Sequence, residues 1–205
     1  MSEGAPRRRT SRQQHAADAA IEVIAKSGLR GLTHRSVDTK AGLPPGSTSS
    51  CFRTRLDLQR AVLDRMVELD REMLAHLPVD GWRVDTAEQR AAIADMLAGL
   101  VDYCLGPARN RTLARLELYL DASRRAELDR ELAAANRGFL ERTAAGMRGA
   151  GIANPTEAAG LLLAQLDGLL YDALTRPFLG GAERKRTRRF LDTIVRGYAP
   201  KAGGD

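Results

Sequence analysis

Residues 32–52 read LTHRSVDTKAGLPPGSTSSCF, and this stretch decides the fold of the chain. Thr33 is a good N-cap for a short helix that Gly42 ends. Pro44-Pro45 then opens a second short helix running to Phe52, because proline in a first turn costs no hydrogen bond. Two short helices joined by a tight turn with glycine are the helix-turn-helix pattern.

The second of these helices is expected to have an inner and an outer face. Thr48 and Phe52 lie four residues apart, so both should face inward. The outward positions hold Pro45, Gly46, Ser47, Ser49 and Ser50. Such small side chains let a helix sit deep in the major groove, where hydroxyls can bond phosphates or base edges. A plain helical hairpin within a core has the same spacing and is the alternative.

The distribution of charge favours the DNA-binding interpretation. The chain carries a net charge of +6. Residues 1–60 hold 11 Lys and Arg against 5 Asp and Glu, whereas residues 61–205 hold 21 of each kind. A local basic excess is typical of a protein with a polyanionic partner, because each neutralised phosphate releases counterions.

The rest of the chain predicts helices. Ala, Leu, Arg and Glu are strong helix formers, and alternating β-branched runs are nearly absent. A capping box at Ser11 starts a helix that Gly28 ends. Caps and breaks place further helices at about 54–77, 86–105, 108–124, 126–148, 155–175 and 182–198. The predicted fold class is all-α, with a three-helix head, a helical body and about nine helices.

The head resembles the TetR-type (tetracycline-repressor-like) transcriptional regulators over about residues 11–60. The matching residues are Gly28 at the end of the first helix, Thr33, Ala41-Gly42-Leu43, Gly46-Ser47, Phe52, Thr54-Arg55 and Leu58. The stretch RTLARLELYL at 111–120 resembles one branch of the family. The resemblance implies a basic arm at 1–10, a DNA-binding domain at 11–57 and a ligand-binding and dimerisation domain at 58–200.

The resemblance also implies roles for single residues of the head. Thr33 and Arg35 would contact DNA, and Thr54 and Arg55 would hold a phosphate at a helix N-terminus, where the field favours anions. The recognition element would comprise Pro44, Pro45, Gly46, Ser47, Ser49 and Ser50.

The chain departs from the family at three positions of this element. Pro45, Ser49 and Cys51 stand where the family often has lysine, tyrosine and an aromatic residue. We expect His34, Arg35 and an arginine arm to compensate; the arm consists of Arg7, Arg8 and Arg9. Such an arm can enter the minor groove or act as a non-specific tether, and the sequence leaves both open.

The helix at 155–175 predicts a dimer, because its leucines cover more than one face and have to be buried on more than one side. By resemblance, this helix and the one at 182–198 form a four-helix bundle across a two-fold axis. Two recognition helices about 34–36 Å apart would then read a palindromic operator.

Members of the family usually respond to a small molecule, so the resemblance implies a homodimeric repressor released by a ligand. Candidate pocket residues are polar or soft side chains within apolar stretches: Met66, Met73, Tyr103, Glu117, Asp167 and Tyr171. Each can also be an ordinary core, cap or surface residue. The five methionines and few aromatic residues favour a modest apolar pocket.

Other function classes find little support in the sequence. The three histidines are scattered, and there is no HExxH motif, phosphate-binding loop or nucleophile elbow, so we expect no enzyme, cofactor or metal site. No apolar run is long enough to span a bilayer, and no secretory signal is visible, which predicts a cytoplasmic protein with reduced cysteines. Cys51 is either a redox sensor or a small space-filling residue. A basic helical protein that coats DNA or membrane surfaces is the alternative function, with a helical enzyme behind it.

Overall fold

The computed structural model describes residues 10–177 and 183–199, and every regular element within these ranges is helical. The predicted all-α fold with nine α-helices is thus confirmed for this part of the chain. The helices are α1 (Ser11–Gly31), α2 (His34–Ala41), α3 (Ser47–Cys51), α4 (Arg55–Ala75), α5 (Ala87–Leu105), α6 (Arg109–Ala122), α7 (Ala126–Gly149), α8 (Pro155–Thr175) and α9 (Arg184–Gly197), with a short 3-10 turn, η1, at Val79–Gly81.

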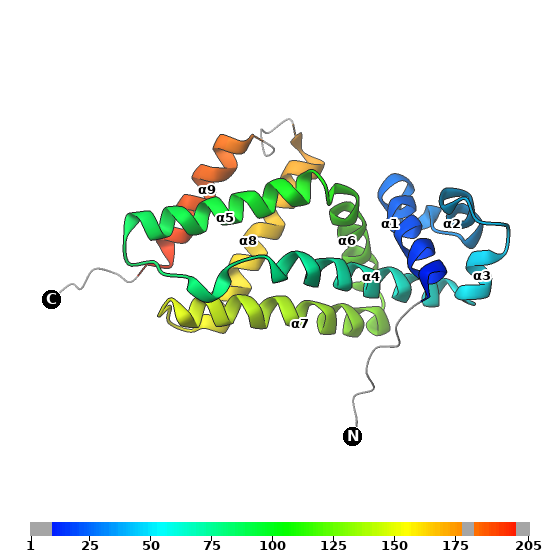
Figure 1. Cartoon of the computed structure of the whole chain (residues 1–205), viewed down its shortest axis with the longest axis horizontal. Helices are drawn as coiled ribbons and strands as arrows, with labels where there is room; N and C mark the ends of the chain where they lie inside the picture. Colours follow the sequence, from blue (N-terminus) through cyan, green and yellow to red (C-terminus); the bar gives the residue numbers. More distant parts are fainter. Residues whose placement is uncertain (1–9, 178–182, 200–205) are drawn as a thin grey trace, which may run out of the picture.

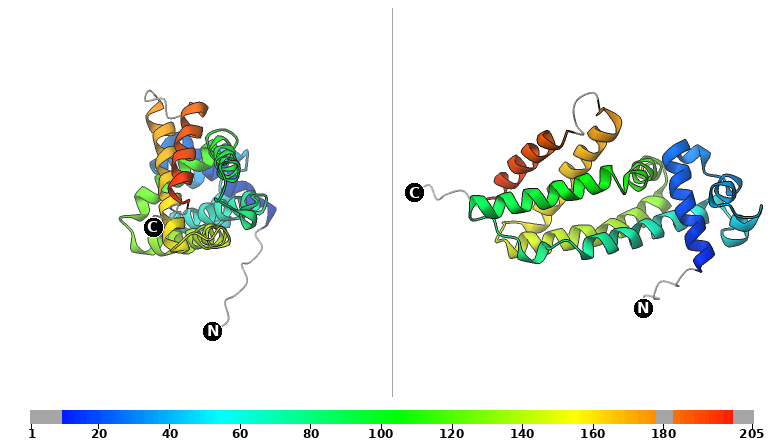
Figure 2. Two further views of the ribbon diagram at one scale, coloured as in Figure 1. Left: turned by 90° about the vertical axis from the view of Figure 1, so that its left-hand side faces the viewer. Right: turned by 45° about the horizontal axis from the view of Figure 1, so that its top comes forward.

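The three N-terminal helices form a head at one end of the molecule, and the remaining helices form an elongated body (Figure 1). Helix α4 leads from the head along the body, with α7 below it and α5 above it in this view. Helix α6 lies between α1 and the body. Helices α8 and α9 cover one flank, where Figure 2 shows them next to each other.

Threonine caps fix the starts of four helices. Thr33, Thr54 and Thr86 each form a capping box in which the side chain accepts the N3 amide and the N3 side chain accepts the cap amide. The box of α1 is built on Thr10 and Gln13, one residue earlier than the predicted Ser11. Gly28 interrupts the regular helix with a φ of 64°, in agreement with the predicted end.

The start of α3 differs from the prediction. Pro44 and Pro45 lie in the turn before the helix, and Gly46 is its N-cap with a φ of 87°. The reason is that an acidic side chain of α2, described below, binds the amides at this turn and thereby sets the first residue of the helix. Sequence spacing shows the prolines but not this tertiary contact.

Two apolar cores hold the molecule together. One joins the head to the body: Ile24, Val37 and Phe52 pack in the same cluster as Leu58 of α4 and Leu118 of α6. The other lies within the body and is built around residues of η1, α5, α7, α8 and α9. The head core therefore continues through α4 and α6, which makes these two helices the physical link between head and body.

Within the described ranges no single helix is long and apolar enough to cross a membrane. Helices α5 and α6 reach the required length and apolar composition only when taken together, and this pair is bent by 84°.

Candidate functional site

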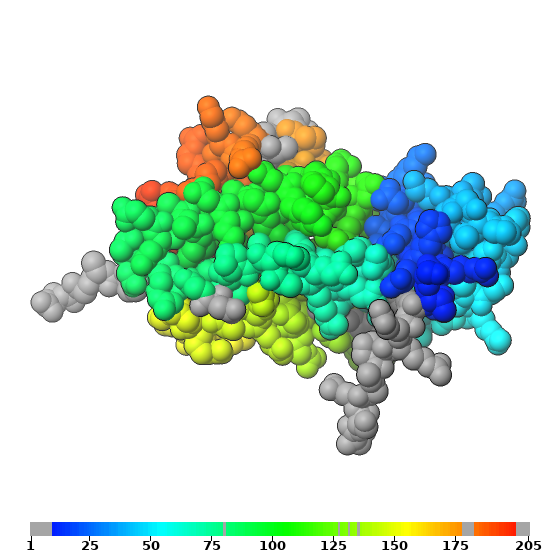
Figure 3. Space-filling view, viewed as in Figure 1, coloured from blue at the N-terminus to red at the C-terminus, as the bar shows by residue number. Residues whose placement is uncertain are grey.

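Helices α2 and α3 form a helix-turn-helix at the tip of the head, the right-hand end of the molecule in Figure 3. Gly42 ends α2 in the left-handed conformation with a φ of 62°, which allows the tight turn. Thr48 and Phe52 are both buried, so the predicted inner face of the second helix is confirmed. The outer face, with Ser49 and Ser50, is exposed.

Asp38 of α2 holds helix α3 in place. Its carboxylate accepts the amide N–H of Gly46 at 2.8 Å, the amide N–H of Thr48 at 2.8 Å and the Thr48 hydroxyl at 2.5 Å. Only 4% of Asp38 is exposed. Burial opposes ionisation, but the hydrogen bonds from Thr48 and Gly46 outweigh it and lower the pKa of Asp38 below its ordinary value. The start of α3 is therefore tied to α2 by a buried, ionised carboxylate.

Sequence reasoning missed Asp38, although a signal was present. Asp38 directly follows the inward-facing Val37, and an acidic residue on the inner side of a short helix needs donors. The nearest donors are the free amides at the start of the next helix.

His34 has a similar role at the other end of α3. Its Nε2 donates to the carbonyl oxygen of Phe52 at 2.7 Å, and the side chain is half-buried. Thr33 and Arg35, on either side of it, are exposed. His34 thus connects the start of α2 to the end of α3, while its neighbours face outward.

The two outer serines of α3 have a defined hydrogen-bond state. The Ser49 and Ser50 hydroxyls both donate to the carbonyl oxygen of Gly46 at 2.9 Å. Their lone pairs are directed away from these bonds and can accept from a partner. Among the other predicted contact residues, Pro44, Pro45 and Gly46 are exposed and Ser47 is half-buried.

Arg55 is engaged within the protein. Its guanidinium donates to the carbonyl oxygens of Leu32, at 2.7 Å, and of Leu29, both at the C-terminal end of α1. The charge therefore stabilises carbonyls at a helix C-terminus. Thr54 caps α4 together with Asp57, whose amide N–H donates to the Thr54 hydroxyl oxygen at 3.0 Å. The predicted arm, Arg7, Arg8 and Arg9, lies outside the described residues.

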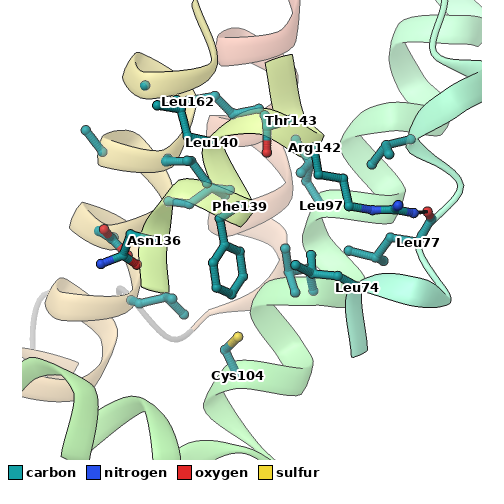
Figure 4. Close-up of a pocket in the computed structure, with 18 of the residues that line it drawn as sticks. Leu74, Leu77, Leu97, Cys104, Asn136, Phe139, Leu140, Arg142, Thr143 and Leu162 are labelled. Carbon is teal, nitrogen blue, oxygen red and sulfur yellow. Dashed lines mark hydrogen bonds between the residues drawn. The ribbon is translucent and has the colours of Figure 1, made fainter. Parts of the chain in front are cut away.

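The body contains a cavity of about 530 Å³ between α4, α5, α6, α7 and α8. Its walls are mainly leucine and methionine side chains, with Phe139 projecting into the space between the helices (Figure 4). Polar groups reach it from three helices: Arg115 and Tyr119 of α6, Asn136, Arg137, Arg142 and Thr143 of α7, and Asp167 of α8.

Two separate sets of contacts join polar groups at the cavity wall. Arg115 pairs with Asp70 of α4 at 2.5 Å and lies over the Phe139 ring at 5.9 Å. Arg111 adds a second contact to Asp70 at 3.1 Å. Tyr119 donates to the side-chain oxygen of Asn136 at 2.8 Å. Together these contacts link α4, α6 and α7 along one wall of the cavity.

Comparison with known proteins identifies the family. A sequence model described as "Tetracyclin repressor-like, C-terminal domain" matches residues 88–197, which is more than half of the chain. The chain belongs to the TetR family. No curated protein sequence matches the chain at a significant level.

Solved structures of TetR-family regulators resemble this chain along most of its length. The multidrug binding protein EbrR complexed with proflavin is 29% identical and covers 90% of this chain and 99% of its own, with a TM-score of 0.59. A TetR family member from Streptomyces coelicolor A3 is also 29% identical, covers 90% and 98%, and has a TM-score of 0.67. A transcriptional regulator from Rhodococcus sp. Rha1, at 24% identity, covers 92% and 96% with a TM-score of 0.75.

The TetR-family fold makes this chain a DNA-binding transcriptional regulator with a ligand-binding body. Regulators of this family are generally not enzymes. Among the described residues, no group of three or more His, Cys, Asp and Glu side chains could hold a metal ion.

Two of the six predicted pocket residues, Met73 and Asp167, line the cavity of this TetR-family body. Asp167 is exposed by surface area, yet desolvation by the surrounding protein raises the pKa of its carboxyl although Arg115 opposes the shift. The structure places the other four residues outside the cavity wall. The rotation of each helix about its own axis decides which residues face the cavity, and the sequence alone does not give this rotation.

These four residues have other surroundings. Met66 is buried in the core between head and body. Tyr103 is partly exposed, with Arg111 5.6 Å above its ring. Glu117 accepts the amide N–H of Leu29 at 3.4 Å and so faces α1. Tyr171 is exposed, with Arg176 5.7 Å from its ring.

Proposed function

We propose that this protein is a homodimeric repressor that binds a palindromic operator through α2 and α3 and is released by a small lipophilic ligand in the body. The observation that carries the proposal is the buried Asp38, which fixes α3 so that Ser49 and Ser50 face outward from a basic head. In this proposal residues 1–10 are a basic arm, 11–57 the DNA-binding domain and 58–200 the ligand-binding and dimerisation domain.

The hydrogen-bond state of α3 indicates what it reads. Because the Ser49 and Ser50 hydroxyl protons are used on Gly46, their oxygens act as acceptors. The matching donors in the major groove are the N4 amino group of cytosine and the N6 amino group of adenine. Thr33, Arg35 and the α4 amides then supply phosphate contacts, which fix the register on the duplex.

The exposed surface of α8 and α9 supports a dimer. Leu161 and Tyr171 of α8 are 56% and 47% exposed, and Phe190 of α9 is 44% exposed. A groove between the two helices is lined by Gly168, Leu169 and Phe190 among others. Large exposed apolar groups on two neighbouring helices are typical of a protein interface. A two-fold axis through this face joins two copies into the proposed four-helix bundle.

The cavity supports release by a ligand, because its volume lies within the range of about 300–1,000 Å³ that is typical of small-molecule sites. The related EbrR structures contain proflavin, ethidium, malachite green or imidazole. Helix α6 connects the cavity to the head: Arg115 lines the cavity, while Asn110 donates to Glu22 of α1 at 2.5 Å. A ligand that shifts α6 would therefore move the head.

Fluorescence anisotropy with labelled DNA from the region upstream of the gene tests the proposal. We expect tight binding that unlabelled specific DNA competes away, while unrelated DNA of equal length competes only weakly at physiological salt. Equal competition by every sequence would support the alternative of a non-specific DNA-coating protein. Absence of any DNA binding would exclude both.

A further inference from the structure

Two buried N–H donors at the cavity have no acceptor among the described residues. They are Nε of Arg142 and Nε1 of Trp82, and both side chains line the cavity. Trp82 is only 6% exposed. Native proteins pair nearly all buried donors, and a donor left without a partner costs folding free energy. Two such donors on side chains that line one cavity therefore indicate an acceptor that the protein itself does not provide; both nitrogens are shielded in the ligand-free chain, so the side chains have to turn towards the cavity to reach it.

Both donors belong to the end of the cavity where α7 crosses the segment at 77–82. A terminal guanidinium nitrogen of Arg142 donates to the carbonyl oxygen of Leu77 at 3.0 Å, and Figure 4 shows the side chain reaching from α7 towards Leu77. Trp82 packs one helical turn further along α7, since a Cβ added at Gly146 would lie 3.1 Å from Cε3 of its ring. The two side chains are therefore neighbours along one helix face.

The charge balance of the cavity points to an anion at this end. Arg115 has a carboxylate partner, Asp70, at 2.5 Å. For Arg142 the described residues show a neutral carbonyl as its partner, and neither Arg142 nor Arg137, which also lines the cavity, has a described carboxylate within ion-pair distance. A guanidinium without a counter-ion in apolar surroundings binds a carboxylate or similar oxyanion strongly. Asp167, the acidic group of the cavity, lies on a different helix, α8.

We propose that the cavity binds a lipophilic molecule with one oxyanion head, such as a carboxylate, which accepts the N–H groups of Arg142 and Trp82. The apolar part of the ligand lies among the leucines of α4, α5, α7 and α8, of which Leu74, Leu97, Leu140 and Leu162 are examples (Figure 4). This inference rests on the proposed function, in which the cavity is the effector site, and names the chemical class of that effector.

A comparison of three probes with one tail tests the head group. Decanoate, decan-1-ol and decyltrimethylammonium carry a ten-carbon chain with an anionic, a neutral and a cationic head. Isothermal titration calorimetry of the full-length protein, below micelle-forming concentrations, should show decanoate binding about ten-fold tighter than decan-1-ol, the difference expected for hydrogen bonds to a charged group. Tighter binding of decyltrimethylammonium, or equal binding of all three, would overturn the proposal.

Two variants locate the head group. Arg142→Gln keeps a donor for Leu77 but removes the charge, and Trp82→Phe keeps a ring but removes the N–H. Each should reduce the preference for decanoate over decan-1-ol, whereas the control Arg148→Gln, at an exposed arginine of the same helix that does not line the cavity, should leave it unchanged. Thermal melting without ligand shows whether each variant folds. If both folded variants retain the full preference, the head group binds elsewhere and the proposal fails.

The inference and the proposed function can fail separately. Specific DNA binding by the ligand-free protein tests the repressor and does not depend on the effector class. If decanoate releases the native protein from operator DNA but does not release Arg142→Gln, the repressor function and the anionic effector are supported together. Operator binding together with tighter binding of the cationic probe would retain the repressor and reject the anionic effector.

Discussion

Replacing Asp38 with asparagine tests whether one buried carboxylate positions the recognition helix. Asparagine has the same shape, and its single oxygen can still accept from Thr48. Its amide nitrogen then faces the Gly46 N–H, so the 2.8 Å bond to that amide is lost and a donor faces a donor. A hydrogen bond to a charged group contributes about 1.5–3 kcal/mol. A loss of about 2 kcal/mol lowers the Tm by roughly 4–8 °C in a chain of this size.

Two assays separate the expected effects of Asp38→Asn. Thermal unfolding followed by circular dichroism measures the loss of stability, and fluorescence anisotropy measures operator affinity at a temperature where the variant is folded. We expect affinity to fall about ten-fold, because a recognition helix without its anchor has to be reordered upon binding. Asp129→Asn, the same change at an exposed carboxylate of α7, is the control. Unchanged Tm and unchanged affinity in Asp38→Asn would refute the anchoring role.

The stabilisation by Asp38 also depends on pH, with a sign that follows from its depressed pKa. The folded-state pKa lies below the ordinary value of 3.8, so the unfolded chain takes up the proton first as the pH falls. The contribution is complete above about pH 4 and disappears as the pH falls through the folded-state pKa. The difference in stability between the native protein and Asp38→Asn should therefore be constant near neutral pH and shrink in acid.

Four further changes test the head, the proposed dimer and the cavity wall. Arg35→Ala should weaken DNA binding similarly for all sequences and leave the Tm unchanged. Arg55→Ala should also lower the Tm, because the Arg55 guanidinium bonds the end of α1. Salt-dependent anisotropy measures the DNA binding of both variants, and melting curves measure their Tm. Leu161→Glu should convert a dimer to monomers in light scattering, and Leu120→Glu, at a leucine that is 59% exposed on α6, should not. Asp70→Asn should destabilise the protein by about 3–5 kcal/mol in urea unfolding, because two arginines lose a buried partner.

The sequence predicts the elements of the fold well because local chemistry decides them. Thr33, Thr54 and Thr86 are caps whose partners lie three residues away, and Gly42 takes up the left-handed conformation that its position suggests. The inward pair on α3 follows from helical spacing alone. None of these features needs a partner that is distant in the chain.

The sequence does not predict contacts between elements that are distant in the chain. Asp38 meets Thr48 across a turn, Arg55 meets Leu29 across the head, and Glu117 meets Leu29 from 88 residues away. Helical periodicity gives the apolar stripe of each helix but not its rotation relative to its neighbours. For this reason Met73 lines the cavity while Met66, two turns earlier on α4, lies in the core between head and body.

Helix α6 is where binding in the body can influence the head, because its faces serve both. One face packs Leu118 into the core shared with α1, and the adjacent face directs Arg115 and Tyr119 to the cavity. A ligand changes operator affinity only by as much as it distinguishes between two positions of this helix. Asp70 couples a movement of α6 to α4, because it pairs with Arg115 of α6. Helix α4 begins directly after α3. A ligand that pushes against Arg115 therefore acts on both helices that connect the body to the head.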